Sequence, residues 1–207
     1  MEQRSPEWLQ VRWGKITASR MADVIAKTKS GYAASRKNYL AELVIERLTP
    51  PPTEDDGYKN QAMQFGIDNE PVARLAYELE TGYTVEEAFF EQLDDDIGAS
   101  PDGYVTDDGL IEIKCPNTAT HIDTLRSRKV PNQYFVQIQG QLLCTGRDWC
   151  DFVSFDPRLP ENAQLFIKRV KRDEAYIKDL LKELNKFITE LEKEVDYIKS
   201  YKGGQSE

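Results

Sequence analysis

The stretch Ser100-Pro101-Asp102-Gly103, followed by Leu110-Ile111-Glu112-Ile113-Lys114-Cys115, decides the fold and points to the chemistry of this chain. Asp102 lies in a Pro-Asp-Gly turn, and the apolar run around Glu112 is typical of a buried strand. Because side chains alternate along a strand, Glu112 and Lys114 point to the same face. A charge among Leu, Ile and Cys neighbours is unfavourable unless it has a use. The stretch therefore predicts a β-hairpin that carries a charged site.

The residue types of this hairpin favour metal-dependent hydrolysis of a phosphodiester. Two carboxylates on neighbouring strands can share one divalent cation, and Lys114 can then lie beside the metal-bound water. The chain has one histidine, His121, which excludes a site with several histidines, so a bound metal must be held mainly by oxygen ligands, which points to Mg²⁺, Mn²⁺ or Ca²⁺. The alternative is a hairpin with a surface Glu–Lys pair and an ordinary turn aspartate.

Two further features fit this chemistry, and each has an alternative. Glu70, at the end of the stretch Phe65–Glu70, can supply a third carboxylate from a helix, or it is a surface residue of that helix. Gln137 and Gln141 are one helical turn apart, so their amides can bond to the water or to the DNA backbone. A solvated helix face explains the two glutamines equally well.

Length and composition indicate one globular domain. The chain has 207 residues, of which 40% are hydrophobic and 30% are charged. We expect a single domain over residues 1–207, with a helical part at 1–48 and a frayed tail at 200–207. No apolar stretch is long enough for a transmembrane helix or a secretory signal, so we expect a cytoplasmic protein without a membrane partner. Three sparse cysteines argue against a disulfide framework or a zinc ribbon.

Charge is distributed unevenly along the chain. The formal net charge is −9, but the first 41 residues hold eight basic and three acidic residues, a net charge of +5. The rest of the chain therefore carries −14. This asymmetry predicts a local anion-binding face on an acidic body, and chance clustering is the alternative.

Periodicity predicts an α/β (α+β) fold with a central mixed sheet flanked by helices. We expect helices at 16–25, capped by Thr17 or Ser19, and at 39–48, 61–81, 119–145 and 173–199. We expect a loop at 49–57, a glycine C-cap at Gly82 and short strands between residues 85 and 114. Two more strands are expected at 149–155 and 164–170. The apolar face expected of the helix at 61–81 comprises Phe65, Val72, Leu75, Ala76 and Leu79. The helix at 173–199 is expected to be amphipathic, with an apolar stripe of Ile177, Leu180, Leu181, Leu184, Phe187, Ile188, Leu191, Val195 and Ile198.

These residues resemble the PD-(D/E)xK nuclease superfamily and, within it, the phage lambda exonuclease family of YqaJ-type viral recombinases. The resemblance covers about residues 6–200 and rests on several motifs in order. They are Glu7–Ser19, Gly66–Glu70, Ser100–Gly103, Glu112–Pro116, Tyr134–Gln139, Phe155–Arg158 and Arg172–Glu174.

The resemblance implies a restriction-endonuclease-like core and a Mg²⁺-dependent, ATP-independent 5′→3′ exonuclease. Such an enzyme resects linear double-stranded DNA to mononucleotides and leaves a 3′ single-stranded tail for phage-type recombination by single-strand annealing. The resemblance further implies two metal ions per site, with Mn²⁺ as a substitute and Ca²⁺ as a non-productive ion. It also implies a ring-shaped homotrimer, a single-strand annealing protein as partner, and a phage or prophage protein in the cytoplasm of a bacterial host.

The same resemblance assigns roles to individual residues. The expected metal ligands and catalytic groups are Asp102, Glu112, the main-chain carbonyl of Ile113, Lys114, the helix-borne acid Glu70 and the active-site amide Gln137. Arg12 and Ser19 match residues that hold the terminal 5′-phosphate of the DNA. Lys29 falls where another base of that pocket is expected, with lysine in place of the arginine of the best-known family member. For Arg12, a surface ion pair with Glu7 or Glu46 is the alternative.

Three other functions compete with this interpretation. One is an endonuclease or junction resolvase of the same superfamily, which would not need the end-phosphate motif between Trp8 and Ser19. Another is an iron–sulfur relative, which would need four cysteine ligands where this chain has three. The last is a non-catalytic module that binds DNA ends. Mg²⁺-dependent release of nucleotides separates this module from an enzyme.

Overall fold

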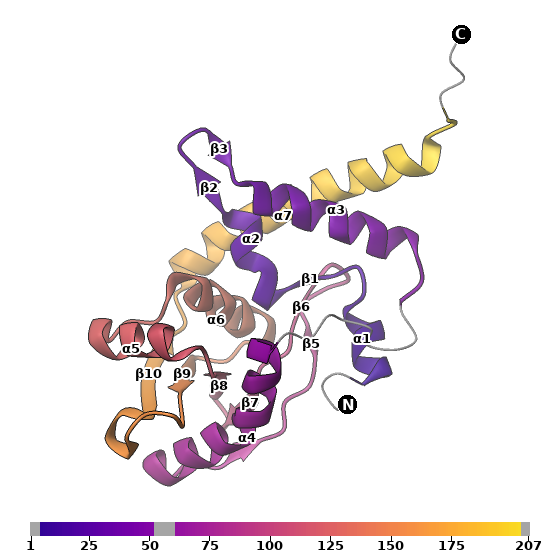
Figure 1. Cartoon of the computed structure of the whole chain (residues 1–207). Coiled ribbons are helices and arrows are strands. Elements are labelled where there is room, and N and C mark those ends of the chain that lie inside the picture. Colours follow the sequence, from indigo (N-terminus) through magenta and orange to yellow (C-terminus); the bar gives the residue numbers. More distant parts are fainter. Residues whose placement is uncertain (1–4, 52–60, 204–207) are drawn as a thin grey trace.

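The computed structural model describes residues 5–51 and 61–203, and a mixed sheet lies at its centre (Figure 1). The helices are α1 (Pro6–Arg12), α2 (Met21–Ile25), α3 (Ala34–Leu48), α4 (Gln61–Thr81), α5 (Thr118–Ser127), α6 (Asn132–Thr145) and α7 (Glu174–Ser200). The strands are β1 (Ile16–Thr17), β2 (Lys27–Thr28), β3 (Gly31–Tyr32), β4 (Val85–Glu86), β5 (Glu91–Gln92), β6 (Ile97–Ala99), β7 (Gly103–Val105), β8 (Gly109–Lys114), β9 (Trp149–Phe155) and β10 (Leu165–Lys171). Two 3₁₀ turns are η1 (Ala18–Arg20) and η2 (Glu161–Ala163).

The central sheet has the strand order β10-β9-β8-β7-β4. Strands β8 and β9 are parallel, and the other neighbours are antiparallel, so the sheet is mixed as expected. Alternation along β8 directs Ile111 and Ile113 toward α4 and Leu110 toward α6. Each face of the sheet is thus covered by a helix, which is the α/β architecture that the periodicity predicts.

A second core joins the N-terminal part to the last helix. Helices α2, α3 and α7 pack together beside the small sheet β1-β6-β5. The buried stripe of α7 agrees with the expected one over most of its length and comprises Ile177, Leu180, Leu184, Phe187, Leu191 and Val195. Ile198, which was expected on this stripe, is exposed near the end of the helix.

The N-terminal part is less helical than expected, and the predicted cap of the helix at 16–25 is wrong. Ile16 and Thr17 form β1, which pairs in parallel with β6. A 3₁₀ turn follows, and α2 begins only at Met21, without a side-chain cap. The hydroxyl of Thr17 lies 3.3 Å from that of Ser19 instead of capping a helix. Long-range pairing with β6 therefore overrides the local helix signal.

The predicted apolar face of α4 is wrong for Val72, Leu75 and Leu79, whereas Ala76 packs against the core as expected. Leu75 and Leu79 are 55% and 79% exposed, and Val72 is 49% exposed, whereas Ala73 and Tyr77 are buried. Ala73 lets the helix approach the sheet closely. Tyr77 is tolerated in the core because its hydroxyl donates a hydrogen bond to Asp151 at 2.8 Å. The buried residues of α4 that pack against the sheet are thus a small one, Ala73, and an amphipathic one, Tyr77. A count of hydrophobic residues selects neither of them.

Three smaller features of the structure bear on the remaining predictions from the sequence. The expected helix at 119–145 is divided into α5 and α6, because Arg128 adopts a left-handed conformation and Pro131 follows it. Gly82 has φ +72° at the end of α4, so the predicted C-cap is confirmed. Residues 52–57 of the predicted loop and residues 204–207 of the predicted tail lie outside the described residues. In the described part of the chain, every helix is too short or too polar to span a bilayer.

Candidate active site

The β7–β8 hairpin brings Asp102, Glu112 and Lys114 together. Asp102 immediately precedes β7, and the register pairs Gly103 with Ile111, so Asp102 lies level with Glu112. One carboxylate oxygen of Asp102, Oδ2, accepts a hydrogen bond from the main-chain N–H of Ile113 at 2.7 Å. Lys114 forms an ion pair with Glu112. The turn and the alternating strand thus place these groups as the sequence predicts.

Glu112 is fully buried, and three donors surround its carboxylate. The amide of Gln137 donates to Oε1 at 2.6 Å, and the amide of Gln141 donates to Oε2 at 2.5 Å. Lys114 is the third donor. Both glutamines are buried on α6 and face the sheet, so the alternative of a solvated helix face is wrong for them.

The electrostatics of the cluster show that negative charge is concentrated there. Burial raises the pKa of Asp102 well above its usual value, and the nearby carboxylates of Glu112 and Glu70 raise it further. Burial alone lowers the pKa of Lys114, but the attraction of Glu112 and Asp102 outweighs burial, and the pKa is raised overall. Lys114 therefore carries its positive charge at neutral pH, and Glu70 lies close enough to influence Asp102.

The residues of the cluster fit a hard divalent cation. Asp102, Glu112 and the carbonyl of Ile113 are oxygen donors, which Mg²⁺ and Mn²⁺ prefer. A cation would also relieve the repulsion that raises the pKa of Asp102. The side-chain oxygen of Gln141 is buried without a hydrogen-bond partner, so an acceptor in this site is unused. Among residues 5–51 and 61–203, no three side chains of His, Cys, Asp or Glu converge on one point, so a main-chain oxygen or water would have to complete the shell.

Arg74 is a residue of this site that the sequence reasoning missed. Its guanidinium donates to the main-chain oxygen of Asp102 at 2.5 Å and thus connects α4 to the turn that carries Asp102. Arg74 lies one helical turn after Glu70, and this spacing is the signal that would have found it. Tyr77, one turn after Ala73, secures the same helix through its bond to Asp151 on β9.

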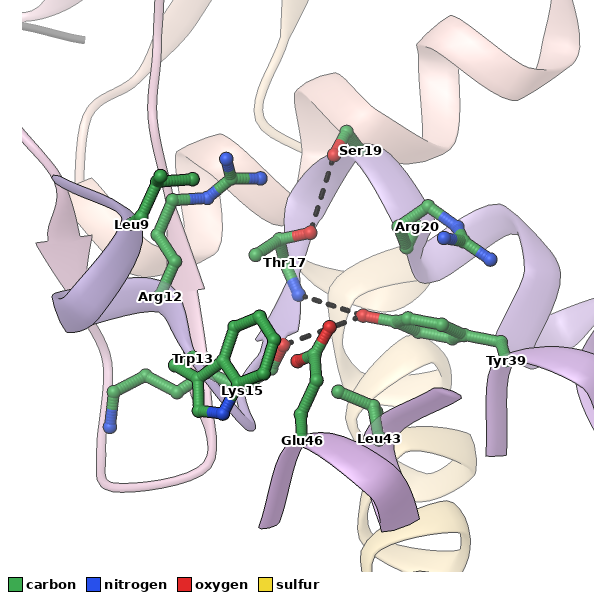
Figure 2. Close-up of a pocket in the computed structure, with 10 residues that line it drawn as sticks. All are labelled: Leu9, Arg12, Trp13, Lys15, Thr17, Ser19, Arg20, Tyr39, Leu43 and Glu46. Atoms are coloured by element: carbon green, nitrogen blue, oxygen red, sulfur yellow. Dashed lines mark hydrogen bonds between the residues drawn. The ribbon is translucent and has the colours of Figure 1, made fainter. Parts of the chain in front are cut away.

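A second site lies in the N-terminal part and contains two of the three predicted phosphate ligands. Figure 2 shows Arg12, Thr17 and Ser19 around a cavity of about 240 Å³. Arg20, Tyr39 and Glu46 line the same cavity. The hydroxyl of Tyr39 accepts a hydrogen bond from the main-chain N–H of Thr17 at 3.2 Å, which orders the turn that carries Ser19.

Arg12 is the unusual residue of this cavity. Burial lowers the pKa of its guanidinium to about 10, so it remains charged at neutral pH. Its Nε is buried without a hydrogen-bond partner. The guanidinium stacks on the ring of Trp8 at 3.7 Å, and it has no ion pair with either Glu7 or Glu46, which are both described. The predicted alternative of a surface ion pair is therefore wrong. The cavity contains the positively charged guanidinium of Arg12, and its Nε–H is not used in a hydrogen bond.

The two sites are physically connected. The indole N–H of Trp8 donates to the hydroxyl of Ser100 at 3.0 Å, and Ser100 lies two residues before Asp102. Trp8 thus contacts Arg12 on one side and the turn before Asp102 on the other, so it links the cavity around Arg12 to the Asp102 cluster.

Lys29 does not join this cavity. It lies in the exposed turn between β2 and β3, and it is absent from the residues that line the cavity. The hairpin is held against α7 by an ion pair between Lys27 and Glu183. The expectation that Lys29 lies in the same pocket as Arg12 and Ser19 is therefore wrong, because the hairpin directs its turn away from β1.

The motif Phe155–Arg158 supports the chain that follows β8. Arg158 donates three hydrogen bonds to Asp156, two to Oδ1 at 3.0 and 2.7 Å and one to Oδ2 at 3.0 Å. The guanidinium also donates to the main-chain oxygen of Pro116 at 3.1 Å and stacks on Phe65 of α4 at 4.1 Å. Arg158 thus secures the chain that follows Lys114 against the helix that carries Glu70.

A mixed sheet with an Asp–Glu–Lys cluster beside a cation-lined cavity defines a nuclease fold, and comparisons with known proteins agree. The family model of the YqaJ-like viral recombinase domain matches residues 7–148. An alkaline exonuclease from Laribacter hongkongensis, LHK-Exo, has 49% identity and a TM-score of 0.87, with 94% of this chain and 96% of that chain covered. The structure of LHK-Exo in complex with dAMP has 48% identity and a TM-score of 0.86 over the same shares.

A more distant structure has the same fold. A phage related exonuclease from Haemophilus somnus 129PT has 17% identity and a TM-score of 0.69, with 90% of this chain and 95% of that chain covered. The search of curated proteins finds no match. The chain belongs to the YqaJ-like viral recombinase family, the lambda exonuclease type of nuclease. Its homology to an exonuclease supports a hydrolase of phosphodiester bonds that takes part in phage-type recombination.

Proposed function

We propose that this protein is a Mg²⁺-dependent, ATP-independent 5′→3′ exonuclease that resects linear double-stranded DNA and leaves a 3′ single-stranded tail. The observation that carries the proposal is the buried Glu112 carboxylate, which accepts hydrogen bonds from two glutamines and pairs with Lys114 beside Asp102. Burying so much charge is unfavourable unless a ligand uses it. The chain that carries Glu112 is 49% identical to an alkaline exonuclease, and this similarity supports such a use.

Each residue of the cluster has a definite role in this proposal. Asp102, Glu112 and the carbonyl of Ile113 would hold the divalent cation, with two ions per site when DNA is bound. When bound, the cation would lower the pKa of a coordinated water and neutralise phosphate charge. Lys114 is charged and partly exposed, so it donates to the attacking water or to the scissile phosphate. Gln137 orients Glu112, and Glu70 adds a further acidic group near Asp102.

The cavity around Arg12 binds the terminal 5′-phosphate in this proposal. A terminal phosphate carries up to two negative charges, whereas an internal diester carries one, so a buried guanidinium distinguishes an end from the interior. Arg12 has an unused donor, and the hydroxyl of Ser19 lines the same cavity. LHK-Exo has been crystallised with dAMP, a mononucleotide that carries a 5′-phosphate, and this supports a mononucleotide product here.

We further propose a homotrimer and a partnership with a single-strand annealing protein, in the cytoplasm of a bacterial host of a phage or prophage. Val72, Leu75 and Leu79 form an exposed apolar stripe on α4, which supports contact with another copy of the chain. A closed three-fold ring would bury three such contacts and would keep DNA threaded between cuts.

A digest of linear duplex DNA tests the proposed reaction. Duplexes with 5′-phosphate and with 5′-hydroxyl ends are incubated with and without Mg²⁺, and products are separated by length and by strand. We expect mononucleotides from the 5′-ended strand, a preference for phosphorylated ends, and no products without metal. Cleavage of circular duplex at internal sites would instead identify an endonuclease. Retention of DNA ends without any products would identify a non-catalytic module.

Light scattering tests the proposed assembly. The expected mass is about three times 23.8 kDa. The variant Leu79→Asp places a charge on the exposed stripe of α4 and should shift the protein to monomers. A stable monomer for the unmodified protein at micromolar concentration would contradict the ring.

A further inference from the structure

A groove of about 850 Å³ follows β10 on the side of the molecule that is formed by α5, β10 and the start of α7. One wall comprises residues 127–130, and the other comprises residues 168–174. Because neighbouring residues of a strand point to opposite faces, a groove lined by every residue from 168 to 171 lies along the edge of the strand. We name it the β10 groove.

The edge that lines the β10 groove has no neighbouring strand. In the order β10-β9-β8-β7-β4, β10 is the last strand of its sheet, and within the described residues it pairs with β9 alone. The outward-facing N–H and C=O groups of an edge strand form a template for another strand. The seven residues of β10 are long enough for such pairing, which would use the edge before the main-chain oxygen of Lys171, because that oxygen already accepts a hydrogen bond from the amide of Gln139 at 2.8 Å.

The rim of the β10 groove is positively charged. Arg128, Lys129, Lys168 and Lys171 are all exposed, and none has an ion-pair partner among the residues that the structure describes. Two acids also line the groove: Glu174 is paired with Arg172, and Asp173 accepts a hydrogen bond from the main-chain N–H of Tyr176 at the start of α7. One groove is therefore lined by four basic side chains that have no ion-pair partner among the described residues, in a protein whose net charge is −9.

The apolar residues of the β10 groove include one aromatic ring. Val130, Phe135 and Val170 line the groove. The rings of Phe135 and Tyr176 pack edge to face, with the ring centroids 5.0 Å apart. Single-stranded nucleic acid is held by several rings on which successive bases stack, whereas Phe135 is the one aromatic residue among the described residues that line this groove. An extended peptide needs only an apolar floor, charges at the rim and a free strand edge.

We propose that the β10 groove binds an acidic, extended segment of a partner protein, which adds a strand to the sheet at β10. Main-chain hydrogen bonds to β10 supply affinity, apolar side chains of the segment contact Val130 and Val170 on one face of the sheet, and its carboxylates contact Lys171 on the other face. Lys168 and Lys171 also repel a second copy of β10, so they permit an acidic strand and exclude a basic one. This inference stands independently of the proposed nuclease reaction, because the groove shares no residue with the Asp102 cluster.

Binding of a synthetic peptide to the full-length protein tests the inference. The probe is a labelled peptide of about ten residues that alternates Glu and Val, long enough to cover β10. The variant Lys168→Glu with Lys171→Glu reverses the rim charge, and the matched control is Lys193→Glu with Lys202→Glu, which makes the same charge change on exposed positions near the other end of α7. We expect about tenfold or weaker binding by the rim variant, and unchanged binding by the control.

Two further measurements separate strand addition from simple charge attraction. A peptide of the same sequence with alternate amides methylated cannot pair with β10, and we expect it not to bind. Hydrogen exchange of the amides in residues 166–171 should slow when the unmodified peptide is added. Nuclease activity should be the same in the rim variant and the unmodified protein, so failure of the peptide test is distinguishable from failure of the proposed reaction.

Several outcomes would overturn the inference. One is equal binding of the peptide by the rim variant and the unmodified protein. Another is absence of peptide binding, or binding that methylation leaves unchanged. If the rim variant loses affinity for an oligothymidylate while it keeps affinity for the peptide, the groove binds single-stranded nucleic acid instead.

Discussion

The two charged sites of this protein differ in whether the buried charge has hydrogen-bond partners within the protein. The carboxylate of Glu112 is surrounded by Gln137, Gln141 and Lys114, so its hydrogen-bonding capacity is satisfied within the protein. Arg12 is also largely buried, but its Nε has no hydrogen-bond partner and its pKa is lowered by burial. A satisfied buried charge is already fixed in position for a reaction, whereas an unsatisfied one is unfavourable until a ligand pairs with it.

The largest effect is expected at the satisfied site. Glu112→Gln keeps the size of the side chain but removes the charge that a cation needs. We expect the rate of DNA hydrolysis to fall by about a thousandfold or more, while DNA binding in Ca²⁺ is retained. Asp102→Asn and Lys114→Ala should be similarly inactive, but Lys114→Ala should still bind metal, because a charged lysine cannot be a ligand. Mg²⁺-dependent nucleotide release measures the rates, and calorimetry measures metal binding.

The matched control for this prediction is Glu86→Gln, the same substitution at an exposed position of β4 in the same sheet. It should leave the rate unchanged. Normal turnover by Glu112→Gln or Asp102→Asn would show that the cation is held elsewhere.

The next effect concerns the unsatisfied site. Arg12→Met removes the buried charge, and we expect the preference for 5′-phosphorylated over 5′-hydroxyl ends to fall about tenfold or more. The same variant should be more stable, by about 1–3 kcal/mol at neutral pH, because a guanidinium whose pKa is lowered by burial opposes folding while it is charged. Digestion rates on the two substrates and urea unfolding measure both effects.

Lys37→Met is the control for Arg12→Met, since it removes one positive charge from an exposed position of α3. It should alter neither the phosphate preference nor the stability by much. A variant Arg12→Met that keeps the full preference for phosphorylated ends would place the phosphate pocket elsewhere.

A smaller effect should follow from changing a residue that only positions Glu112. Gln141→Leu removes the donor to Oε2, and we expect kcat at saturating DNA to fall about tenfold, with a higher Mg²⁺ requirement. The second carboxylate oxygen keeps its bond from Gln137, so the loss should be less than for Glu112→Gln. A merely structural role predicts reduced stability with unchanged metal dependence, and thermal unfolding beside a Mg²⁺ titration separates the two.

The smallest effect is on stability alone. Burial raises the pKa of Asp156, but hydrogen bonds from Arg158 outweigh burial and hold the pKa at about 2. The folded pKa lies below the usual value of 3.8, so Asp156 contributes stability above pH 3.8 that is lost as the pH falls through about 2. Asp156→Asn should reduce the free energy of unfolding by about 2 kcal/mol at pH 7, and the difference should shrink below pH 4. Urea unfolding at several pH values measures this, and a pH-independent difference would contradict the assignment.

Most of the predictions that the structure confirms concern residues that are close together in the chain. Asp102, Glu112 and Lys114 were predicted to meet because a Pro-Asp-Gly turn and the two-residue period of a strand are local properties. The mixed sheet and the buried stripe of α7 were predicted for the same reason. The failures at 16–25 and on α4 arose where a distant partner, β6 or Asp151, changed the local preference.

The sequence by itself determined the family, the acidic cluster on the hairpin and the basic character of the N-terminal part. Only the tertiary structure decided that Gln141 faces Glu112, that Arg74 holds the turn of Asp102, and that Trp8 connects Arg12 to that turn. It also decided that Lys29 lies away from the cavity around Arg12. The physical reason is that periodicity specifies which side chains share a face, whereas packing between distant elements specifies what that face meets.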